Sequence, residues 1–300
     1  FAHLHVHTEY SLLDGANRIK PLVARVKEMG MEYIAITDHG NMFGIMDFYK
    51  TCKAEGVNPV IGCEVYVAPR DRHEQYEVES TRYYHLILLA ENNEGYKNLV
   101  QLVSRANTEG MYYKPRVDKE LLRKYSKGLI CLSACIAGEV PAWIIRGDMY
   151  RAEKALQEYL EIFGPENYFI EIQNHGRAEE KIAMDGIIPL AKKYNLGLVA
   201  TNDAHYLKKE DSEFHEVLLC IQTGKTLDDP NRMKFSSDDY YLKSPEEMAG
   251  IFREYPEAIA NTVKIASRCH VEFDFDHRHL PLFPLPESMT DEMYLRKLCE

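Results

Sequence analysis

The segment that decides the fold is residues 2–7, AHLHVH, which leads into TEYSLLDG at residues 8–15. In an extended strand, side chains two positions apart point to the same face of the sheet. His3, His5 and His7 are therefore expected to share one face, while Leu4 and the other apolar residues face the opposite way. Asp14 follows in the next loop. The segment predicts a strand that carries imidazoles on one side and ends near a carboxylate.

Further along the chain, short apolar runs alternate with longer amphipathic stretches, a pattern typical of strands joined by crossover helices. The predicted strands are Ala2–His7, Tyr33–Thr37, Pro59–Val67, Tyr83–Leu89, Gly128–Leu132, Tyr168–Ile172 and Leu198–Thr201. The predicted helices between them are Ile19–Met29, Phe48–Ala54, Gly95–Arg105, Pro141–Ile145, Tyr150–Phe163 and Ala178–Tyr194. Seven strands predict an α/β fold, a (β/α)7 barrel built on a parallel sheet.

Polar residues interrupt the apolar pattern where a barrel presents its working side chains, at strand ends and in the loops that follow. They are His39 after the second strand, Glu64 in the third, His85 in the fourth, Cys135 after the fifth, and Asp203 and His205 after the last. A carboxylate such as Glu64 inside an apolar strand is costly to bury unless cations or hydrogen bonds compensate it. Imidazoles, carboxylates and one thiolate together suit zinc first, then manganese or iron. We therefore expect a metal centre rather than a purely structural cluster.

The other histidines carry weaker signals. His3 is expected to lie behind the predicted ligands. His277 and His279 repeat the His-x-His spacing, but in a proline-rich stretch where no sheet would fix them, so we expect both to be solvated. The remaining histidines lack a partner at useful spacing and are expected to be structural or exposed: His73, His175, His215 and His270.

The end of the chain departs from the strand and helix alternation. Helices are predicted at Glu213–Ile221, Glu246–Arg253 and Glu257–Cys269, packed on the outside of the barrel. Residues 275–288, FDHRHLPLFPLPES, are rich in proline and predict an extended linker. We expect a barrel domain at residues 1–285, followed at 286–300 by the linker and the start of a further region. The first residue, Phe1, and a helix still running at residue 300 indicate a fragment.

Composition narrows the expected setting. The chain has 47 acidic against 36 basic residues and a formal charge of −11, so its surface should repel the phosphate backbone and hold DNA weakly on its own. Seven scattered cysteines without a CxxC pair favour a reducing compartment. No apolar run approaches the roughly 18 residues that cross a bilayer. A cytoplasmic protein without a membrane partner is expected.

Six motifs in this order resemble the PHP (polymerase and histidinol phosphatase) family: HLHVHTEYSLLDG, AITDHGNMFG, IGCEVYV, YYHLILLA, LSACIAGEV and ATNDAHYL. The stretches TDHGNMFG, ENNEGYKNLVQLVS and FREYPEAIANTVKIASRCHVEF are similar in particular to the version at the N-terminus of the bacterial DNA polymerase III alpha subunit. The resemblance covers essentially the whole chain. It implies a distorted seven-stranded barrel of the PHP type with a site for three divalent metal ions.

The resemblance also implies which residues hold these ions. They are His5, His7, Glu64 and Asp203 for one ion, Glu64, His85 and Cys135 for a second, and Asp14, His39 and His205 for the third. All nine positions are present, which disfavours a version that has lost its metals. No separate catalytic side chain is assigned, and metal-bound hydroxide is the expected nucleophile.

Three functions remain open at this point. The first is the PHP domain of a replicative DNA polymerase, hydrolysing phosphodiesters as a 3′-5′ proofreading exonuclease on a DNA primer strand. The second is an inert scaffold that docks the remainder of the polymerase alpha subunit or a separate proofreading exonuclease subunit. The third is a stand-alone metal-dependent phosphatase, which the cut-off final helix and the missing initiator Met disfavour. Metal content distinguishes the first from the second, because a scaffold need not keep its ligands.

Overall fold

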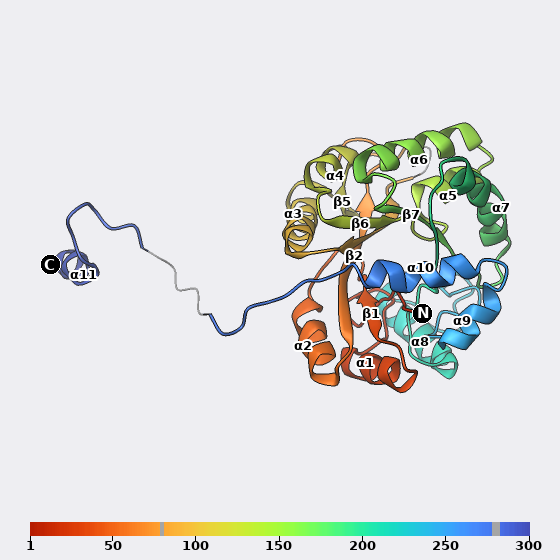
Figure 1. The fold of residues 1–300 in the computed structure, drawn as a ribbon, viewed down its shortest axis with the longest axis horizontal. Helices are drawn as coiled ribbons and strands as arrows, with labels where there is room; N and C mark the ends of the chain where they lie inside the picture. Colours follow the sequence, from red (N-terminus) through yellow and green to blue (C-terminus); the bar gives the residue numbers. More distant parts are fainter. Residues whose placement is uncertain (79–80, 278–282) are drawn as a thin grey trace.

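The computed structural model describes residues 1–78, 81–277 and 283–300 (Figure 1). Its strands are β1 (Tyr33–Ile36), β2 (Asn58–Val67), β3 (Tyr84–Ala90), β4 (Met111–Tyr112), β5 (Lys114–Val117), β6 (Leu129–Leu132), β7 (Tyr168–Ile172) and β8 (Leu198–Ala200). Its helices are α1 (Ile19–Glu28), α2 (Ile45–Glu55), α3 (Asn93–Glu109), α4 (Lys119–Tyr125), α5 (Glu139–Ile145), α6 (Met149–Phe163), α7 (Ala178–Lys193), α8 (Ser212–Thr223), α9 (Pro245–Ile251), α10 (Pro256–Ala266) and α11 (Asp291–Cys299). None of the helices in these ranges is long and apolar enough to span a bilayer.

The strands form one curled sheet in the order β4-β5-β2-β3-β6-β7-β8, with β1 also paired to β2. The mixed α/β barrel-like fold is therefore confirmed. The sheet is not wholly parallel, however, because β3 runs antiparallel to both β2 and β6. As a result, the first residues of β3, and not its last ones, lie at the edge of the sheet where the neighbouring parallel strands end.

The N-terminal segment closes the curl, but it is not the regular strand that was predicted. It makes isolated parallel bridges, from His3 to Ile34 in β1 and from Val6 to Ala204 just after β8. A bend at His5 interrupts the alternation of side chains. Leu4 joins the apolar interior, while His3 points elsewhere, with its Nε2 2.8 Å from the carbonyl oxygen of Lys243. His3 thus does not share a face with His5 and His7, contrary to the prediction.

The inward faces of the strands are apolar where the parallel strands begin. One cluster there joins residues of six strands and the N-terminal segment, including Leu4, Ala35, Val60, Ile87, Leu89, Ile130, Leu132, Phe169 and Val199. Helix α10 adds Ile265 and Ala266 to this cluster, and its Thr262 accepts a 3.0 Å hydrogen bond from the Ala2 backbone N–H. We predicted that α10 would pack outside the barrel. Instead it covers the end of the barrel interior, because its apolar face is buried against the inward residues.

Helices α1 to α7 surround the sheet in Figure 1. Several begin at a polar side chain that satisfies free backbone N–H groups, as Asn92 does for Glu94 and Gly95 at the start of α3. The predicted helices and the strands after the first are present within a few residues. The β4–β5 hairpin and α4 were missed, since both are short, Pro115 lies in β5, and charged residues dominate α4.

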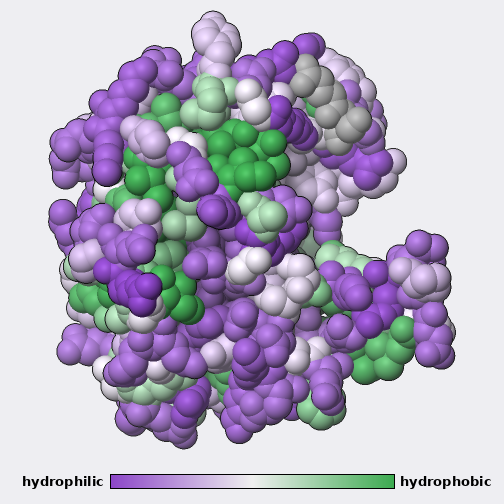
Figure 2. Space-filling model, turned by 90° about the vertical axis from the view of Figure 1, so that its right-hand side faces the viewer, coloured by the Kyte–Doolittle hydropathy of each residue, from purple (hydrophilic) through white to green (hydrophobic). Residues whose placement is uncertain are grey.

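The outer face on the side of α7 and α9 is mostly hydrophilic and is interrupted by separate hydrophobic patches (Figure 2). Beyond α10, His277 is exposed, as expected, and its backbone N–H donates to Asp274. His279 lies outside the described residues. The final helix, α11, begins at Asp291.

Candidate metal centre

The inward-facing side chains of the strands change from apolar to polar at the end of the barrel opposite α10. On β2 the row passes from Val60 to Glu64, and on β7 from Phe169 to Glu171. Because β3 is antiparallel, His85 near its start stands opposite Tyr66, two positions along β2 from Glu64. Glu64 and Glu171 are buried as deeply as the apolar residues, with Glu64 only 1% exposed, while His85 is half-buried. The fold therefore gathers carboxylates in a largely buried place.

His5 and His7 direct ring nitrogens toward two carboxylates. The Nε2 atom of His5 lies 3.1 Å from Asp203 Oδ1 and 3.2 Å from Glu64 Oε1. The Nε2 atom of His7 lies 3.0 Å from the same Asp203 oxygen. The two Nε2 atoms are 3.2 Å apart. Four potential metal-ligand atoms thus lie close together. They are the two Nε2 atoms from the N-terminal segment, Glu64 Oε1 from β2 and Asp203 Oδ1 from the loop after β8.

Glu64 lies between this group and two more imidazoles. Its Oε1 is 3.0 Å from His85 Nδ1, and its Oε2 contacts His39 Nδ1. Cys135 lies behind His85, with Sγ 4.0 Å from His85 Nδ1. The carboxylate of Glu64 therefore contacts groups on both sides, which is the position a bridging ligand needs.

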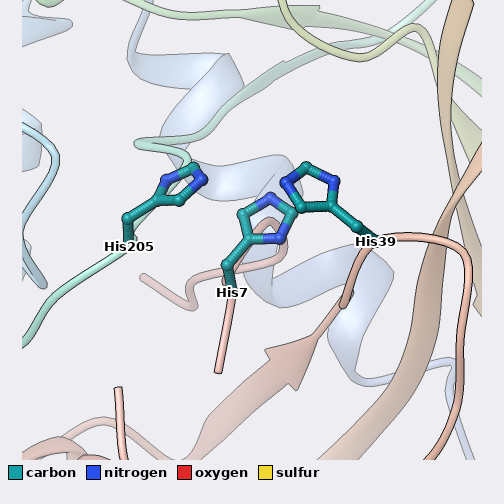
Figure 3. Close-up of side chains that lie close together, drawn as sticks. All are labelled: His7, His39 and His205. Atoms are coloured by element: carbon teal, nitrogen blue, oxygen red, sulfur yellow. The ribbon is translucent and has the colours of Figure 1, made fainter. Parts of the chain in front are cut away.

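Asp14, His39 and His205 complete the set on the loop side. His39 Nε2 is 3.2 Å from Asp14 Oδ1, and His205 Nε2 is 3.8 Å from Asp14 Oδ2. His7 stacks between the two other rings, with centroids 4.0 Å from His39 and 4.3 Å from His205 (Figure 3). All nine residues predicted as ligands are thus brought together in one connected cluster.

Hydrogen bonds to the far side of two rings fix which nitrogen faces the cluster. His5 Nδ1 lies 2.7 Å from Glu171 Oε1, and His7 Nδ1 lies 2.9 Å from Ser11 Oγ. Since the Ser11 hydroxyl donates to Asp38, it accepts from His7 Nδ1–H. Both Nε2 atoms then face the cluster, as the metal-binding nitrogens of histidine ligands do. Sequence reasoning missed Glu171, although it interrupts the apolar strand YFIEI in the same way as Glu64 interrupts β2.

The pKa shifts put the carboxylates and His7 in the protonation states that bind metal. Burial would lower the pKa of His5 and His39, but the carboxylates around these two rings raise it. Burial would raise the pKa of Glu64, but the charges of His85 and His39 hold it well below its usual range. The pKa of Asp203 and of Asp14 is lowered in the same way, against burial, by nearby histidines. Burial, together with the neighbouring His39 and His205, lowers the pKa of His7 to about 3. The acids are therefore ionised and His7 is neutral at physiological pH.

The cluster has buried negative charge and closely spaced ligand atoms, both of which suit the binding of several cations. Both oxygens of Glu64, Asp14 Oδ1 and Asp203 Oδ1 are buried and form no hydrogen bond within the described part of the chain. Buried carboxylate oxygens without donors are costly, and cations would compensate them. The burial of Cys135 raises the pKa of its thiol, which a coordinated metal would deprotonate. Three residue groups have donor atoms close enough to share an ion: His5, His7 and Glu64; His39, Glu64 and His85; His7, His39 and His205.

A cleft of about 290 Å³ opens over this cluster. Its floor includes Glu64, His85 and Asp203, and its far wall is formed by the start of α7 and the loop that precedes α9. Arg177 and Lys234 are the cations that this wall contributes, and neither was singled out from the sequence. The cleft is therefore acidic at its floor and carries positive charge at its wall.

Two histidines that lacked partners in the sequence have them in the structure. The ring nitrogens of His175 contact Glu180 Oε1 at 2.6 Å and the carbonyl oxygen of Asn202 at 2.9 Å, and the ring stacks on Tyr240. His215 Nε2 lies 2.7 Å from the carbonyl oxygen of Asp14. Both are structural, as expected, and both hold chain segments that line the cleft.

Comparison with known proteins agrees with this architecture. A family model described as the PHP domain matches residues 3–175, which contain seven of the nine clustered residues. The chain is 51% identical over 300 residues to the DNA polymerase III subunit alpha of Treponema pallidum, covering 99% of this chain and 26% of that protein. It is 48% identical to the same subunit of Thermus aquaticus, covering 99% of this chain and 25% of that protein. The chain thus spans about a quarter of the length of these relatives.

Solved structures give more distant likenesses. An amidohydrolase from Chromobacterium violaceum, with bound sulfate and no metal, superposes with a TM-score of 0.45 at 13% identity, covering 68% of this chain and 87% of that one. A two-domain protein from Bacteroides vulgatus, containing a predicted PHP-like metal-dependent phosphoesterase, gives 0.39 at 14% identity, covering 68% and 51%. The family model, which matches more than half of the residues, shows that the chain belongs to the PHP domain family.

Proposed function

We propose that the nine clustered residues hold three divalent metal ions and that the site hydrolyses phosphodiesters. The observation that carries this proposal is the set of buried carboxylate oxygens without hydrogen-bond donors, facing the Nε2 atoms of His5 and His7. The mixture of histidine, carboxylate and thiol suits zinc first, then manganese or iron. Glu64 is the proposed bridge, since it contacts His5 on one side and His39 and His85 on the other.

Bound divalent ions would supply Lewis acidity, lower the pKa of a coordinated water and neutralise charge on a phosphoryl group. The chain's own side chains then have distinct tasks. Glu171 and Ser11 hold the rings of His5 and His7 in place through their Nδ1 atoms. Arg177 and Lys234 reach the cleft from its wall and would bind the non-bridging oxygens of a phosphodiester. No carboxylate of the described chain lies within ion-pair distance of Lys234, so its charge is available to a substrate.

We propose that the physiological substrate is the 3′ end of a DNA primer strand, removed one nucleotide at a time as proofreading. The support for this is that the relatives are named as DNA polymerase III subunit alpha, and we propose replication in the cytoplasm as the setting. In that setting residues 1–285 are the PHP domain, and residues 286–300 begin the region that follows it. The remainder of the alpha subunit, and a separate proofreading exonuclease subunit, are the proposed protein partners. Nucleotidyl transfer belongs to parts of the relatives outside this chain.

The test is hydrolysis of a primer with a mismatched 3′ nucleotide by the metal-loaded chain, compared with its Asp203→Asn variant. Asp203 contacts both His5 and His7, so loss of its charge should reduce hydrolysis by more than the roughly 100-fold typical of outer-shell partners. Asp185→Asn, which alters an exposed carboxylate on α7, is the matched control and should change nothing. If a metal-loaded chain leaves both the primer and a small phosphodiester intact, the scaffold function replaces the catalytic one.

A further inference from the structure

The missed β4–β5 hairpin lies directly beside the metal centre. Pro115 in β5 packs so close to Gly40, next to His39, that a Cβ at Gly40 would come within 2.9 Å of the proline ring. The Lys114 Nζ lies 5.7 Å from the centre of the Tyr66 ring, which in turn stacks 6.0 Å from the His39 ring. The hairpin and the loop that carries His39 are thus in contact.

The tip of the hairpin presents an exposed aromatic ring. Tyr113 is the single residue between β4 and β5, it has φ of +61°, and its side chain is 66% exposed. This left-handed conformation suits glycine, and a bulky residue adopts it only with strain. A glycine would therefore make the turn more easily but would provide no ring.

Cations accompany this ring. The Arg82 guanidinium lies 4.1 Å from the centre of the Tyr113 ring, and its Nε donates to Glu77 at 2.6 Å. Within residues 1–78, 81–277 and 283–300, no other side chain accepts from its remaining N–H donors, which could bind a further acceptor. Lys114 has no carboxylate within ion-pair distance among the described residues. In a chain of charge −11, Lys114 and Arg82, the latter paired with Glu77, place two cationic side chains beside the metal centre.

A second aromatic residue connects the tip to the cleft. Tyr83, which follows Arg82, is half-buried and stacks 6.0 Å from the ring of His85, at an interplanar angle of 17°. His85 lines the cleft floor. Aromatic rings interleaved with cations are the pattern by which proteins hold single-stranded nucleic acid, with bases on the rings and phosphates on the cations.

We propose that Arg82, Tyr83, Tyr113 and Lys114, named here the hairpin surface, bind single-stranded DNA just ahead of the nucleotide that enters the cleft. A base stacks on the open face of Tyr113, and Arg82 and Lys114 bind the adjoining phosphates. This inference rests on the proposed function, because it assigns the strand that the metal centre would cleave. It also gives the acidic chain a local means of holding a strand.

The test is binding of a fluorescein-labelled twelve-residue oligothymidylate to the 300-residue chain at low salt, followed by fluorescence anisotropy. Tyr113→Gly should raise Kd about fivefold or more, because base stacking on a ring is lost. The same variant should unfold at an unchanged or higher temperature, because the strained turn is relieved, so weaker binding cannot come from misfolding. Tyr113→Phe keeps the ring and should bind like the unaltered chain.

Lys114→Ala should weaken binding and reduce the slope of log K against log salt by about 0.7, the value for one single-strand phosphate contact. Matched controls are Tyr150→Ala, an exposed tyrosine on α6, and Lys97→Ala, an exposed lysine on α3. Equal effects of Tyr113→Gly and Tyr150→Ala would overturn the proposal. So would equal weakening by Tyr113→Gly of binding to labelled polyglutamate, which would indicate an acidic protein partner instead.

Hydrolysis of bis-p-nitrophenyl phosphate separates this inference from the proposed function, since a substrate this small does not reach the hairpin. If Tyr113→Gly hydrolyses it normally but degrades oligothymidylate more slowly, both proposals are supported. If no variant hydrolyses it but oligothymidylate binding depends on Tyr113, the hairpin surface stands and the catalytic proposal fails. If Tyr113→Gly hydrolyses bis-p-nitrophenyl phosphate normally and binds oligothymidylate as tightly as the unaltered chain, only the proposal for the hairpin surface is wrong.

Discussion

The two ends of the barrel interior are built from the same strands but depend on different forces. At one end, Val60, Leu89 and Phe169 point inward and belong to the same apolar cluster as Ile265 and Ala266 of α10. Two to four positions along the same rows, Glu64 and Glu171 point inward instead. Both ends are buried, yet only the first is stabilised by burial itself, through the hydrophobic effect. The second consists of charges that are stable only with compensating charges.

The apolar end of the barrel interior thus serves mainly stability, and the polar end serves mainly the proposed function. The apolar end should contribute the same free energy of unfolding whatever the pH or metal concentration. The polar end should contribute a free energy that changes with both, since protons and metal ions compete for the same nitrogen and oxygen atoms. Substitutions at the two ends can therefore be told apart by their response to conditions.

The largest effect is expected at Glu64. Glu64→Gln keeps the shape of the side chain but removes the charge that contacts His5, His39 and His85. Metal content should fall by more than one ion per chain, and hydrolysis should become undetectable. Elemental analysis beside a small-phosphodiester assay measures both. The matched comparison is Cys135→Ser, which removes a terminal ligand, and equal losses in the two variants would contradict the bridging role of Glu64.

At the apolar end, Ile130→Ala should lower the free energy of unfolding by about 2–5 kcal/mol, because it leaves a cavity in a fully buried cluster. The loss should be the same in excess metal and in chelator. Urea unfolding under both conditions measures it. A loss that depended strongly on metal would show that the two ends are not independent.

An intermediate effect is expected at Glu171, which touches the cluster only through His5 Nδ1. Glu171→Gln should weaken metal affinity by roughly 10–100-fold, the range for outer-shell partners of metal-binding histidines. Titration with a competing chelator measures the affinity. The change should be smaller than that of Glu64→Gln, and the reverse order would mean that Glu171 itself contacts a metal.

The smallest effect concerns pH in the chelated chain. Burial alone would lower the pKa of His39, but Glu64 and Asp14 raise it to about 10. Since this is above the unfolded value of about 6.5, the stabilisation is complete below pH 6.5 and is lost as the pH rises toward 10. His39→Gln should therefore cost more stability at pH 6 than at pH 9.5 in urea unfolding. Ile130→Ala should cost the same stability at both pH values.

Sequence patterns predicted most of the fold because apolar runs and amphipathic stretches mark buried elements reliably. They also placed all nine clustered residues at strand ends, where the structure brings them together. The N-terminal segment was mistaken for a regular strand because alternation in HLHVHT does not reveal the bend at His5. The reversed direction of β3 could not be read either, since an apolar run has no direction.

Other residues were missed for a different reason. Arg177 and Lys234 approach the cleft from segments far apart in the chain, and nothing in their local sequence distinguishes them from other surface cations. Glu171 was open to prediction by the argument used for Glu64, a carboxylate inside an apolar strand. The position of α10 depends on which part of the sheet its apolar face covers. Tertiary packing decides this, and the local sequence of the helix does not show it.

The measurement that tests the metal centre most directly is the metal content of the purified chain. The chain is equilibrated with zinc or manganese, freed of unbound ions and analysed for metal per chain. We expect three ions per chain in the unaltered protein. Removing them with a chelator should lower the melting temperature, because an ion present at 100 times its Kd stabilises the folded state by about 2.7 kcal/mol. A chain that binds no ion and melts at the same temperature with and without chelator would contradict the account.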